Sequence, residues 1–399
     1  MKKTFNGELI VIFIIMGLAT MAMAVLSPIM PLYLTDKGIM PSIIGLMLSA
    51  AMAGMVFGES SGGWLADKIG LKTPMSIGTF LCAPMVLCFV FVRGVPALFL
   101  VFIFWGLIRA AIFGPARGFI GNTADTSNKA TIIAVYMTAI TASRSLGSLF
   151  SGFIADSRWG YNGDFYLSAG LSVLAGILVF AGLKKMPLWK PVLKTGTQAA
   201  DSLPSSIRTP VNYRPVIIQS IIAMLFFLAI GVNSFLPLLV TEVVKETASK
   251  VGILYTVGGL VSMALFIPLG RLADRKDKKV MIIVGLLLSA LSMVGLAFAR
   301  EYWMLIGLQV VGNIGFAMFT PAAVALLSNI VPAYWQGTAM GVYGAAEDVG
   351  IIIGSGAGGF VWTAGGPTAL YLMGSAAGVV GALVCLVFVR DMTAKKSLA

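Results

Sequence analysis

Histidine does not occur in the 399 residues, and only 11% of them are charged. Without histidine, any proton carrier in this protein must be another side chain. The three cysteines, Cys82, Cys88 and Cys385, lie unclustered inside apolar runs, so the sequence predicts neither a disulfide framework nor a zinc site. There is also no Gly-Lys-Ser loop to hold a phosphate. These absences argue against a membrane enzyme, and no metal or cofactor is expected.

Apolar residues take the place of the missing charge. They make up 58% of the chain, mean hydropathy is +0.95, and there are 46 glycines. Such a composition is far from that of a soluble globular protein and indicates that lipid is the main solvent. A bilayer-spanning helix needs about 20 apolar residues, so this length fits about a dozen spans joined by short loops.

Twelve apolar segments are long enough to cross a membrane. They are approximately residues 8–34, 41–66, 74–92, 97–121, 131–154, 163–183, 216–240, 249–270, 280–299, 302–328, 337–362 and 367–389. The predicted fold class is therefore an all-α polytopic membrane protein with twelve transmembrane helices.

The basic residues give the chain an expected orientation. Net charge is +12, and 19 Lys and Arg residues lie on the side that holds both termini, against six in the opposite loops. By the positive-inside rule both termini are expected in the cytoplasm, in a cytoplasmic (inner) membrane. The excess charge is then a topology signal that contacts anionic lipid, and nucleic acid is not an expected partner.

An internal repeat divides the chain. Leu65-Ala66-Asp67 recurs 207 residues later as Leu272-Ala273-Asp274, and Gly152-Phe153 recurs at the same offset as Gly359-Phe360. We expect six-helix bundles at 1–183 and 215–399, joined by a cytoplasmic linker at 184–214 that is rich in Pro, Ser, Thr and Lys. Two such bundles related by pseudo-symmetry place a solute pathway in a central cavity at their interface.

The loop after the second segment carries a family signature. GGWLADKIGLK, residues 62–72, resembles the major facilitator superfamily motif Gly-x-Leu-Ala-Asp-Arg-x-Gly-Arg-Lys, and a weaker copy follows segment eight. Leu71 replaces the second Arg of the motif, and Asp277 replaces the glycine of the second copy. The resemblance implies a cytoplasmic gate in which loop acids pair with basic neighbours and an acid after span 4. The matching residues are Gly63, Asp67, Lys68, Lys72, Asp125, Asp274 and Arg275.

A second signature of the same family, associated with exporters, is only partly present. Span 5 keeps Gly147 and Gly152 but has Ser148 and Ser151 at the neighbouring small positions, and Ser stands in place of the family's Pro. Span 11 fits better, with Gly341, Gly350, Gly354, Ser355, Gly358 and Gly359. Small residues at these spacings predict close helix–helix approach, whatever the direction of transport.

Ionisable residues inside a span are functional candidates, because each costs on the order of 3 kcal/mol to insert. Arg109 on span 4 and Arg144 on span 5 are predicted to bind substrate. Glu347 and Asp348 on span 11, with Glu59 on span 2, are the predicted proton carriers. Polar residues on spans 5, 7 and 10 complete the predicted substrate site, namely Tyr136, Asn233, Gln309 and Asn313.

The resemblance implies a secondary active transporter that works by alternating access on a small organic solute. The pattern is closest to drug:proton antiporters, which favours proton-coupled efflux, and function as a monomer is expected. The alternative is a proton-coupled carrier of small organic anions, in which Arg109 and Arg144 would hold a carboxylate with their planar donors.

Overall fold

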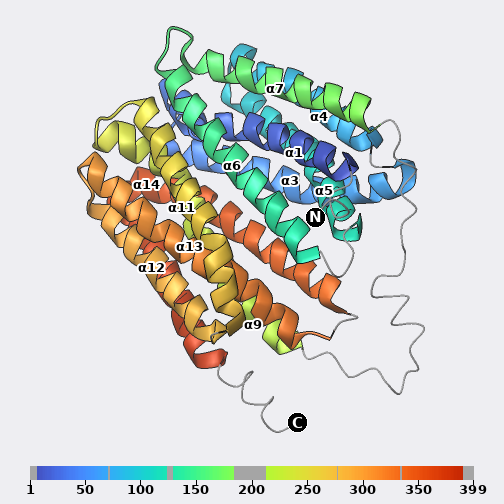
Figure 1. Ribbon diagram of the computed structural model, residues 1–399. Helices are drawn as coiled ribbons and strands as arrows, with labels where there is room; N and C mark the ends of the chain where they lie inside the picture. The colour runs from blue at the N-terminus through green and yellow to red at the C-terminus, as the bar shows by residue number, and fades with distance from the viewer. Residues whose placement is uncertain are drawn as a thin grey trace. The chain divides into compact units, whose positions relative to one another are not determined.

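The computed structural model describes residues 7–70, 72–123, 129–183, 213–275, 277–332 and 335–389, and within them every regular element is a helix (Figure 1). The predicted linker 184–214 lies almost wholly outside these residues. Backbone groups in a bilayer have no water to bond, so spanning segments of this apolarity must satisfy their hydrogen bonds within a helix. The all-α prediction is confirmed.

The helices follow the apolar segments closely. The bounds are α1 Gly7–Leu26, α2 Met30–Asp36, α3 Pro41–Ile69, α4 Lys72–Phe91, α5 Val95–Thr123, α6 Lys129–Ala155, α7 Gly160–Gly182, α9 Tyr213–Val232, α10 Leu236–Leu238, α11 Ala248–Arg275, α12 Lys278–Phe298, α13 Tyr302–Ile330 and α14 Gln336–Phe388, with a 3₁₀ turn η2 at Asn233–Phe235 and a π turn η3 at Leu239–Val243.

Ten stretches of the described residues are long and apolar enough to cross a membrane. One of these stretches, α14, contains a kink at Gly366, whose φ of +71° lies in the left-handed region that favours glycine. It therefore holds both of the last two predicted segments. The helix α6 adds the predicted fifth segment. This arrangement is consistent with twelve spans.

The first and seventh predicted spans are broken at equivalent places. In the first, α1 ends at Leu26 and α2 begins at Met30; in the seventh, α9 ends at Val232 and helical geometry changes three times before Val243. Pro31 and Pro237, which lie 206 residues apart in the two repeats, each stand near the start of the piece after the break. Proline has no N–H to continue the preceding helix, so the repeated residue explains the repeated break.

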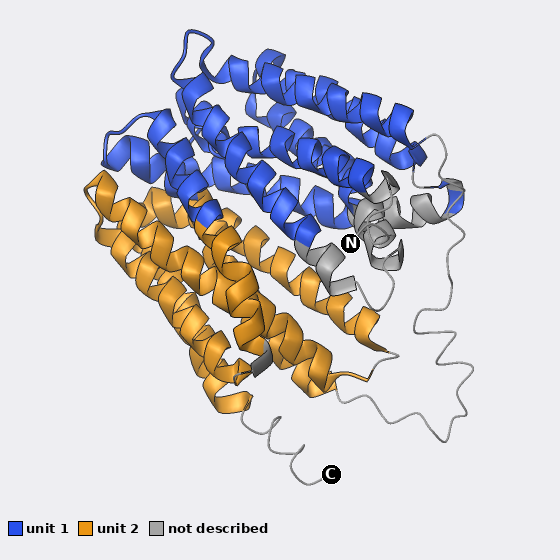
Figure 2. Cartoon of the chain, in the orientation of Figure 1, with its two compact units in different colours: residues 1–191, 235–260 blue, residues 192–234, 261–399 orange. Residues whose placement is uncertain are grey.

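The chain forms two compact units (Figure 2), residues 1–191 with 235–260, and residues 192–234 with 261–399. Residues 235–260 belong to the second sequence repeat, yet they pack with the first six segments. Within this unit, the first turns of α11 therefore pack against helices of the first repeat.

Aromatic side chains form the centre of the first unit. Phe89 of α4 packs edge-on against Phe102 of α5, with ring centroids 4.9 Å apart, and stacks on Phe165 of α7 at 5.7 Å. Tyr33 of α2 packs edge-on against Phe165 at 4.8 Å and donates its hydroxyl to the Phe89 carbonyl. The cluster ties four helices together.

Close packing of α9 on α14 forms the centre of the second unit. A Cβ atom added at Gly350 would lie 2.3 Å from the Met224 carbonyl oxygen, and one at Gly354 would lie 2.1 Å from that of Leu228. The two backbones therefore touch directly. Close helix approach, the predicted role of the small residues on span 11, is confirmed at these two glycines, whereas a Cβ atom added at Gly341 would meet nothing within 4 Å.

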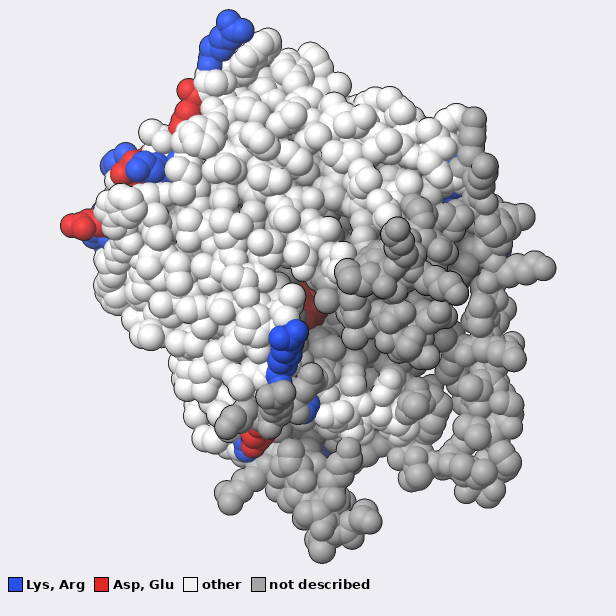
Figure 3. All heavy atoms as spheres, in the orientation of Figure 1, with Lys and Arg blue, Asp and Glu red and all other residues white. Residues whose placement is uncertain are grey.

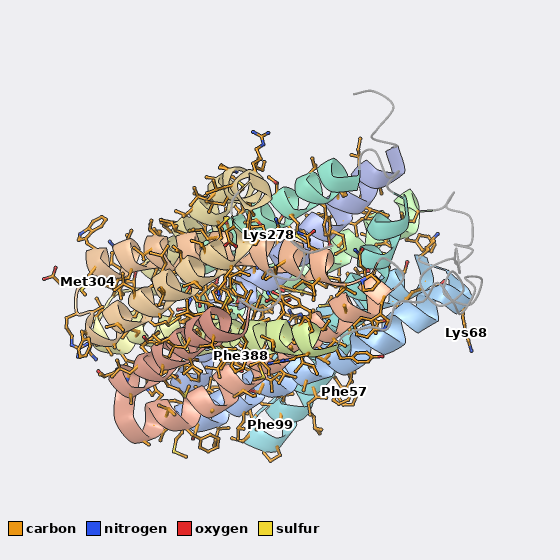
Figure 4. The ribbon with its side chains drawn as sticks, turned by 90° about the horizontal axis from the view of Figure 1, so that it is seen from below. Phe57, Lys68, Phe99, Lys278, Met304 and Phe388 are labelled. Atoms are coloured by element: carbon orange, nitrogen blue, oxygen red, sulfur yellow. The ribbon has the colours of Figure 1, made fainter. Side chains whose placement is uncertain are left out.

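The side chains that face away from these centres are largely apolar. Figure 3 shows that charged residues are sparse on the visible face, and Figure 4 shows Phe57 of α3 and Phe99 of α5 pointing outward from their helices. Phe57 is 75% exposed and Trp303 of α13 is 74% exposed. Apolar exposure on this scale suits a surface covered by lipid.

Candidate functional site

Small residues let α6 and the first turns of α11 meet backbone to backbone. A Cβ atom at Gly152 would lie 2.5 Å from the Ala248 carbonyl oxygen, and one at Gly252 would lie 2.5 Å from that of Ser148. One helical turn further, the Thr256 hydroxyl donates to the Ser145 carbonyl at 3.0 Å. We call this contact, between residues 145–156 and 248–259, the α6–α11 junction.

Asp156, one residue after α6, closes the end of the junction. Its two carboxylate oxygens accept the first backbone N–H groups of α11, from Ala248 at 3.2 Å and from Ser249 at 2.7 Å. Burial raises the pKa of the Asp156 carboxyl, but hydrogen bonds from Ser249, Thr247 and Ala248 outweigh it and hold the pKa below its usual value. The carboxylate thus acts as an N-terminal cap supplied by another helix, aligned with the α11 dipole.

Replacing Asp156 with alanine is expected to loosen the start of α11. Loss of a capping side chain costs about 1 kcal/mol, which corresponds to an increase of about fivefold in local opening. Hydrogen exchange at the Ala248 and Ser249 amides measures it. Asp277→Ala is the matched control, because Asp277 caps α12 through the Lys279 amide at 2.9 Å and should leave the α11 amides unchanged.

The lowered pKa also fixes the pH dependence of this cap. A carboxyl of this kind stabilises the junction above its usual pKa of about 4, and the contribution is lost only as pH falls through the lowered value. Exchange at the two amides should therefore not accelerate through this cap between neutral and mildly acidic pH. Faster exchange at mildly acidic pH that disappears in Asp156→Ala would contradict this assignment.

Arg109, predicted to bind substrate, lies within the first unit. Its guanidinium carbon is 4.6 Å from the centre of the Trp105 ring, one turn earlier on α5, and its Nε donates to the Met23 sulfur of α1 at 3.2 Å. Stacking on an aromatic face and contact with a polarisable sulfur help a cation to lie among helices. The side chain is half-buried, so part of it is still exposed.

Two predicted residues of α6 differ in exposure. Tyr136 is buried, with its ring centroid 5.8 Å from that of Phe13 in α1. Arg144, two turns later, is exposed. The structure therefore places Tyr136 in the packing between α1 and α6, whereas Arg144 presents its charge outside that packing.

The polar residues predicted on span 10 come together in the second unit. Asn313 donates from its side-chain amide to the Gln309 carbonyl at 2.8 Å and accepts the Ser262 hydroxyl of α11 at 2.9 Å. The Gln309 side chain is buried, and Asn233 lies in the 3₁₀ turn that breaks the seventh span. A polar link between α11 and α13 is thus present where the sequence predicts substrate contacts.

The predicted proton carriers on α14 are both half-buried. Glu347 lies beside the hydroxyl of Tyr343, one turn earlier, whose ring is buried. Asp348 is the next residue, about 100° around the helix, so the two carboxylates face different neighbours. The side chain of Glu59, the third predicted carrier, lies outside the described residues.

Part of the predicted gate can be followed. Gly70, the first residue after α3, has φ at +84°, as expected of a glycine required by a tight turn. Lys68 is exposed at the end of α3 (Figure 4), and the Lys72 ammonium lies 4.5 Å from the centre of the Phe180 ring of α7. The backbone of Gly63 lies in α3. The remaining gate groups lie outside the described residues, namely Asp125 and the side chains of Asp67, Asp274 and Arg275.

Two acids near the junction are absent from the sequence-based prediction. Asp156 lies in a short turn, where acidic residues are common, so the sequence does not indicate that it caps α11. Asp164 lies within the predicted sixth span, and that alone was sufficient signal, since an acid inside a span is a functional candidate. Its side chain is fully buried.

Comparison with protein-family models matches residues 12–300 and 221–399 to the Major Facilitator Superfamily. Among curated relatives, quinolone resistance protein NorA of Staphylococcus aureus (strain COL) is 25% identical over 353 residues, which is 88% of each chain. The uncharacterized MFS-type transporter MJ1560 of Methanocaldococcus jannaschii is 24% identical over 346 residues, 84% of this chain and 86% of the relative.

Solved structures share the fold. The nucleoside transporter NupG, as its D323A mutant, superposes with a TM-score of 0.79 at 16% identity and covers 96% of this chain and 99% of its own. The human organic anion transporter MFSD10 (TETRAN) gives a TM-score of 0.67, also at 16% identity, over 95% of this chain and 99% of its own. At such identity the likeness concerns the helical architecture.

Proposed function

Because the chain belongs to the Major Facilitator Superfamily, we propose that it is a secondary active transporter that exports drug-like organic solutes by alternating access, in exchange for protons. The protein is a multi-pass membrane transporter and not an enzyme. The direction of transport, the solute class and the coupling ion are the parts of this proposal that need direct tests.

The α6–α11 junction is the observation that carries the proposal. It joins a helix of the first sequence repeat to a helix of the second through small residues and one exposed capping carboxylate. Contacts of this kind can separate and re-form without leaving a buried charge unpaired. In alternating access one end closes as the other opens, so we assign the junction to the external closure. We assign residues 62–72, of which 62–69 form the end of α3 and not the expected loop, to the cytoplasmic closure.

Relatedness to NorA supports efflux of drug-like compounds, because the match spans 88% of both chains. The excess of Lys and Arg on one side supports cytoplasmic termini, and with that orientation we assign the α6–α11 junction to the external end. Glu347 and Asp348 remain the proposed proton carriers on α14, with Glu59 on α3, and a monomer is the proposed working unit.

Transport of small organic anions is the alternative. It requires Arg109 and Arg144 to hold a carboxylate, and Arg144 is exposed enough to do so. Arg109 is less favourable, because its guanidinium already lies over Trp105 and bonds to Met23. We therefore rank this alternative second.

Proteoliposomes with an imposed pH gradient test the proposal. A panel of cationic drugs and small carboxylates should show proton-driven movement of the drugs, and Glu347→Gln combined with Asp348→Asn should remove accumulation while passive exchange persists. Drugs that do not respond to the pH gradient would overturn the efflux proposal. Carboxylate transport that is lost in both Arg109→Ala and Arg144→Ala would establish the alternative instead.

A further inference from the structure

Asp164 is a carboxylate in a place where a charge is costly. It lies on α7, one turn after the helix begins, and its relative exposure is 0%. Neither carboxylate oxygen has a hydrogen-bond partner of good geometry among the described residues, although the Ser151 hydroxyl of α6 lies beside it. A carboxyl group so enclosed is far more stable as the neutral acid than as an anion.

Among the described residues, the electrostatic partner of the Asp164 carboxyl is the Ser151 hydroxyl, and no cation takes that place. The elements packed there contribute Ser151 and Asp156 from α6 and its following turn, Tyr161 from α7, and Tyr33 and Asp36 from α2. Basic groups near this cluster face aromatic rings: the Lys37 ammonium lies 4.8 Å from the centre of the Tyr33 ring, and the Arg158 guanidinium carbon lies 5.4 Å from the centre of the Trp159 ring. Two further acids and two phenols therefore lie near Asp164, in a site that suits a proton.

Tyr161 connects this site to the surface. It is within electrostatic range of Asp36 and Asp156, which are exposed, and of Asp164, which is buried. Its ring packs edge-on against Tyr33, with centroids 6.3 Å apart. Among the described residues no hydrogen bond joins Tyr161 to Asp164, so a relay requires the two side chains to come together. The phenol oxygen then accepts a proton from the surface side and gives its own proton to Asp164, which moves one proton inward and leaves the phenol neutral.

The same site adjoins the α6–α11 junction. Ser151, beside Asp164, is followed by Gly152, whose carbonyl accepts the Ser249 hydroxyl of α11 at 3.2 Å. Asp156, one turn further, caps α11. A change in the charge of Asp164 would alter the packing of α7 on α6 at the residue next to the contact that must open.

We propose that Asp164 is a proton-binding site of the transport cycle, loaded from the external end through Tyr161 and coupled to the α6–α11 junction through Ser151. This inference rests on the proposed proton coupling and external orientation, and adds a carrier to Glu347, Asp348 and Glu59. The ligand is a proton because a fully buried carboxyl without a hydrogen-bond partner among the described residues is stable only in its neutral, protonated form.

Infrared difference spectroscopy on the full-length protein tests proton binding without any transported solute. The wild type should show the carbonyl band of a protonated carboxylic acid that titrates with pH, and Asp164→Asn should remove that component. Ser151→Ala should shift the band in frequency, which keeps the test available if Asp164→Asn folds poorly. Glu301→Gln, an exposed acid before α13, is the control. An unchanged spectrum in both Asp164→Asn and Ser151→Ala overturns the site.

Two further measurements test coupling and route. In proteoliposomes, Asp164→Asn should reduce pH-driven accumulation at least about tenfold, equivalent to about 1.4 kcal/mol, while exchange without a gradient persists. Tyr161→Phe should keep the infrared band but slow its response to a pH jump. Accumulation unchanged in Asp164→Asn overturns the coupling role. If the wild type shows no pH-driven transport at all, the proposed function fails, and the infrared result still decides whether Asp164 binds a proton.

Discussion

Gly252→Leu is expected to slow transport strongly while the protein still folds and inserts. A Cβ atom at this position would lie 2.5 Å from the Ser148 carbonyl oxygen and 3.1 and 3.2 Å from the backbone N and Cα of Gly152. These are backbone atoms of another helix, so they cannot rotate away. The leucine must push α11 away from α6, so closing the α6–α11 junction becomes unfavourable.

The size of the effect follows from the cost of overpacking, about 1–3 kcal/mol for extra methylenes forced into a close contact. That cost applies to the closed junction and not to the open one, so it shifts the closing equilibrium by roughly 5- to 150-fold. Transport needs both states, and its rate should fall accordingly. The measurement is solute flux in proteoliposomes, with hydrogen exchange at the Ala248 and Ser249 amides as the report on closure.

The matched control is Gly170→Leu on α7, where an added Cβ atom meets nothing within 4 Å. This change carries the same side chain into the same unit and should leave flux and amide exchange near the wild-type values. Wild-type flux in Gly252→Leu together with faster amide exchange would show that the junction does not need to close during the cycle. Wild-type flux with unchanged exchange would contradict the expected clash, because the junction would still close around the leucine.

Much of the fold could be predicted from the pattern of apolar runs. A span must be about 20 apolar residues long and must satisfy its own hydrogen bonds, so run length alone indicates the helices. The break at Gly366 and the turn at Gly70 were also predictable, because a positive φ favours glycine. Placing residues 235–260 with the first unit was not predictable, since periodicity says nothing about which helix a small-residue face will meet.

The types of residue in the candidate site could be predicted from the sequence, but their contacts could not. Inward charges such as Arg109 stand out in the sequence, but its stacking on Trp105 depends on a rotamer that the sequence does not specify. The small residues of span 5 were recognised, yet their partner Gly252 was not, because close approach needs matching surfaces on two helices. Asp164 could have been predicted as a functional residue, because it is an acid inside a span. The role of Asp156 could not, because it depends on hydrogen bonds to the α11 amides.

Replacing Gly354 with alanine is expected to destabilise the second unit severely. The single added methyl would lie 2.1 Å from the Leu228 carbonyl oxygen, 2.9 Å from its carbonyl carbon and 3.1 Å from the Cα of Gly231, all on α9. Because α9 and α14 touch through their backbones here, the helices must separate and lose packing along their shared length. A cost of about 3 kcal/mol corresponds to a fall in Tm of roughly 6–12 °C for a unit of this size.

Gly344→Ala on the same helix should act in the opposite direction. Nothing lies within 4 Å of an added Cβ atom at Gly344, so alanine there gains about 0.5–1 kcal/mol from its better helix propensity. Thermal unfolding of the two purified variants in the same detergent measures the contrast. Equal Tm values would mean that α9 and α14 are not held by direct backbone contact, and that the small residues of span 11 serve another purpose.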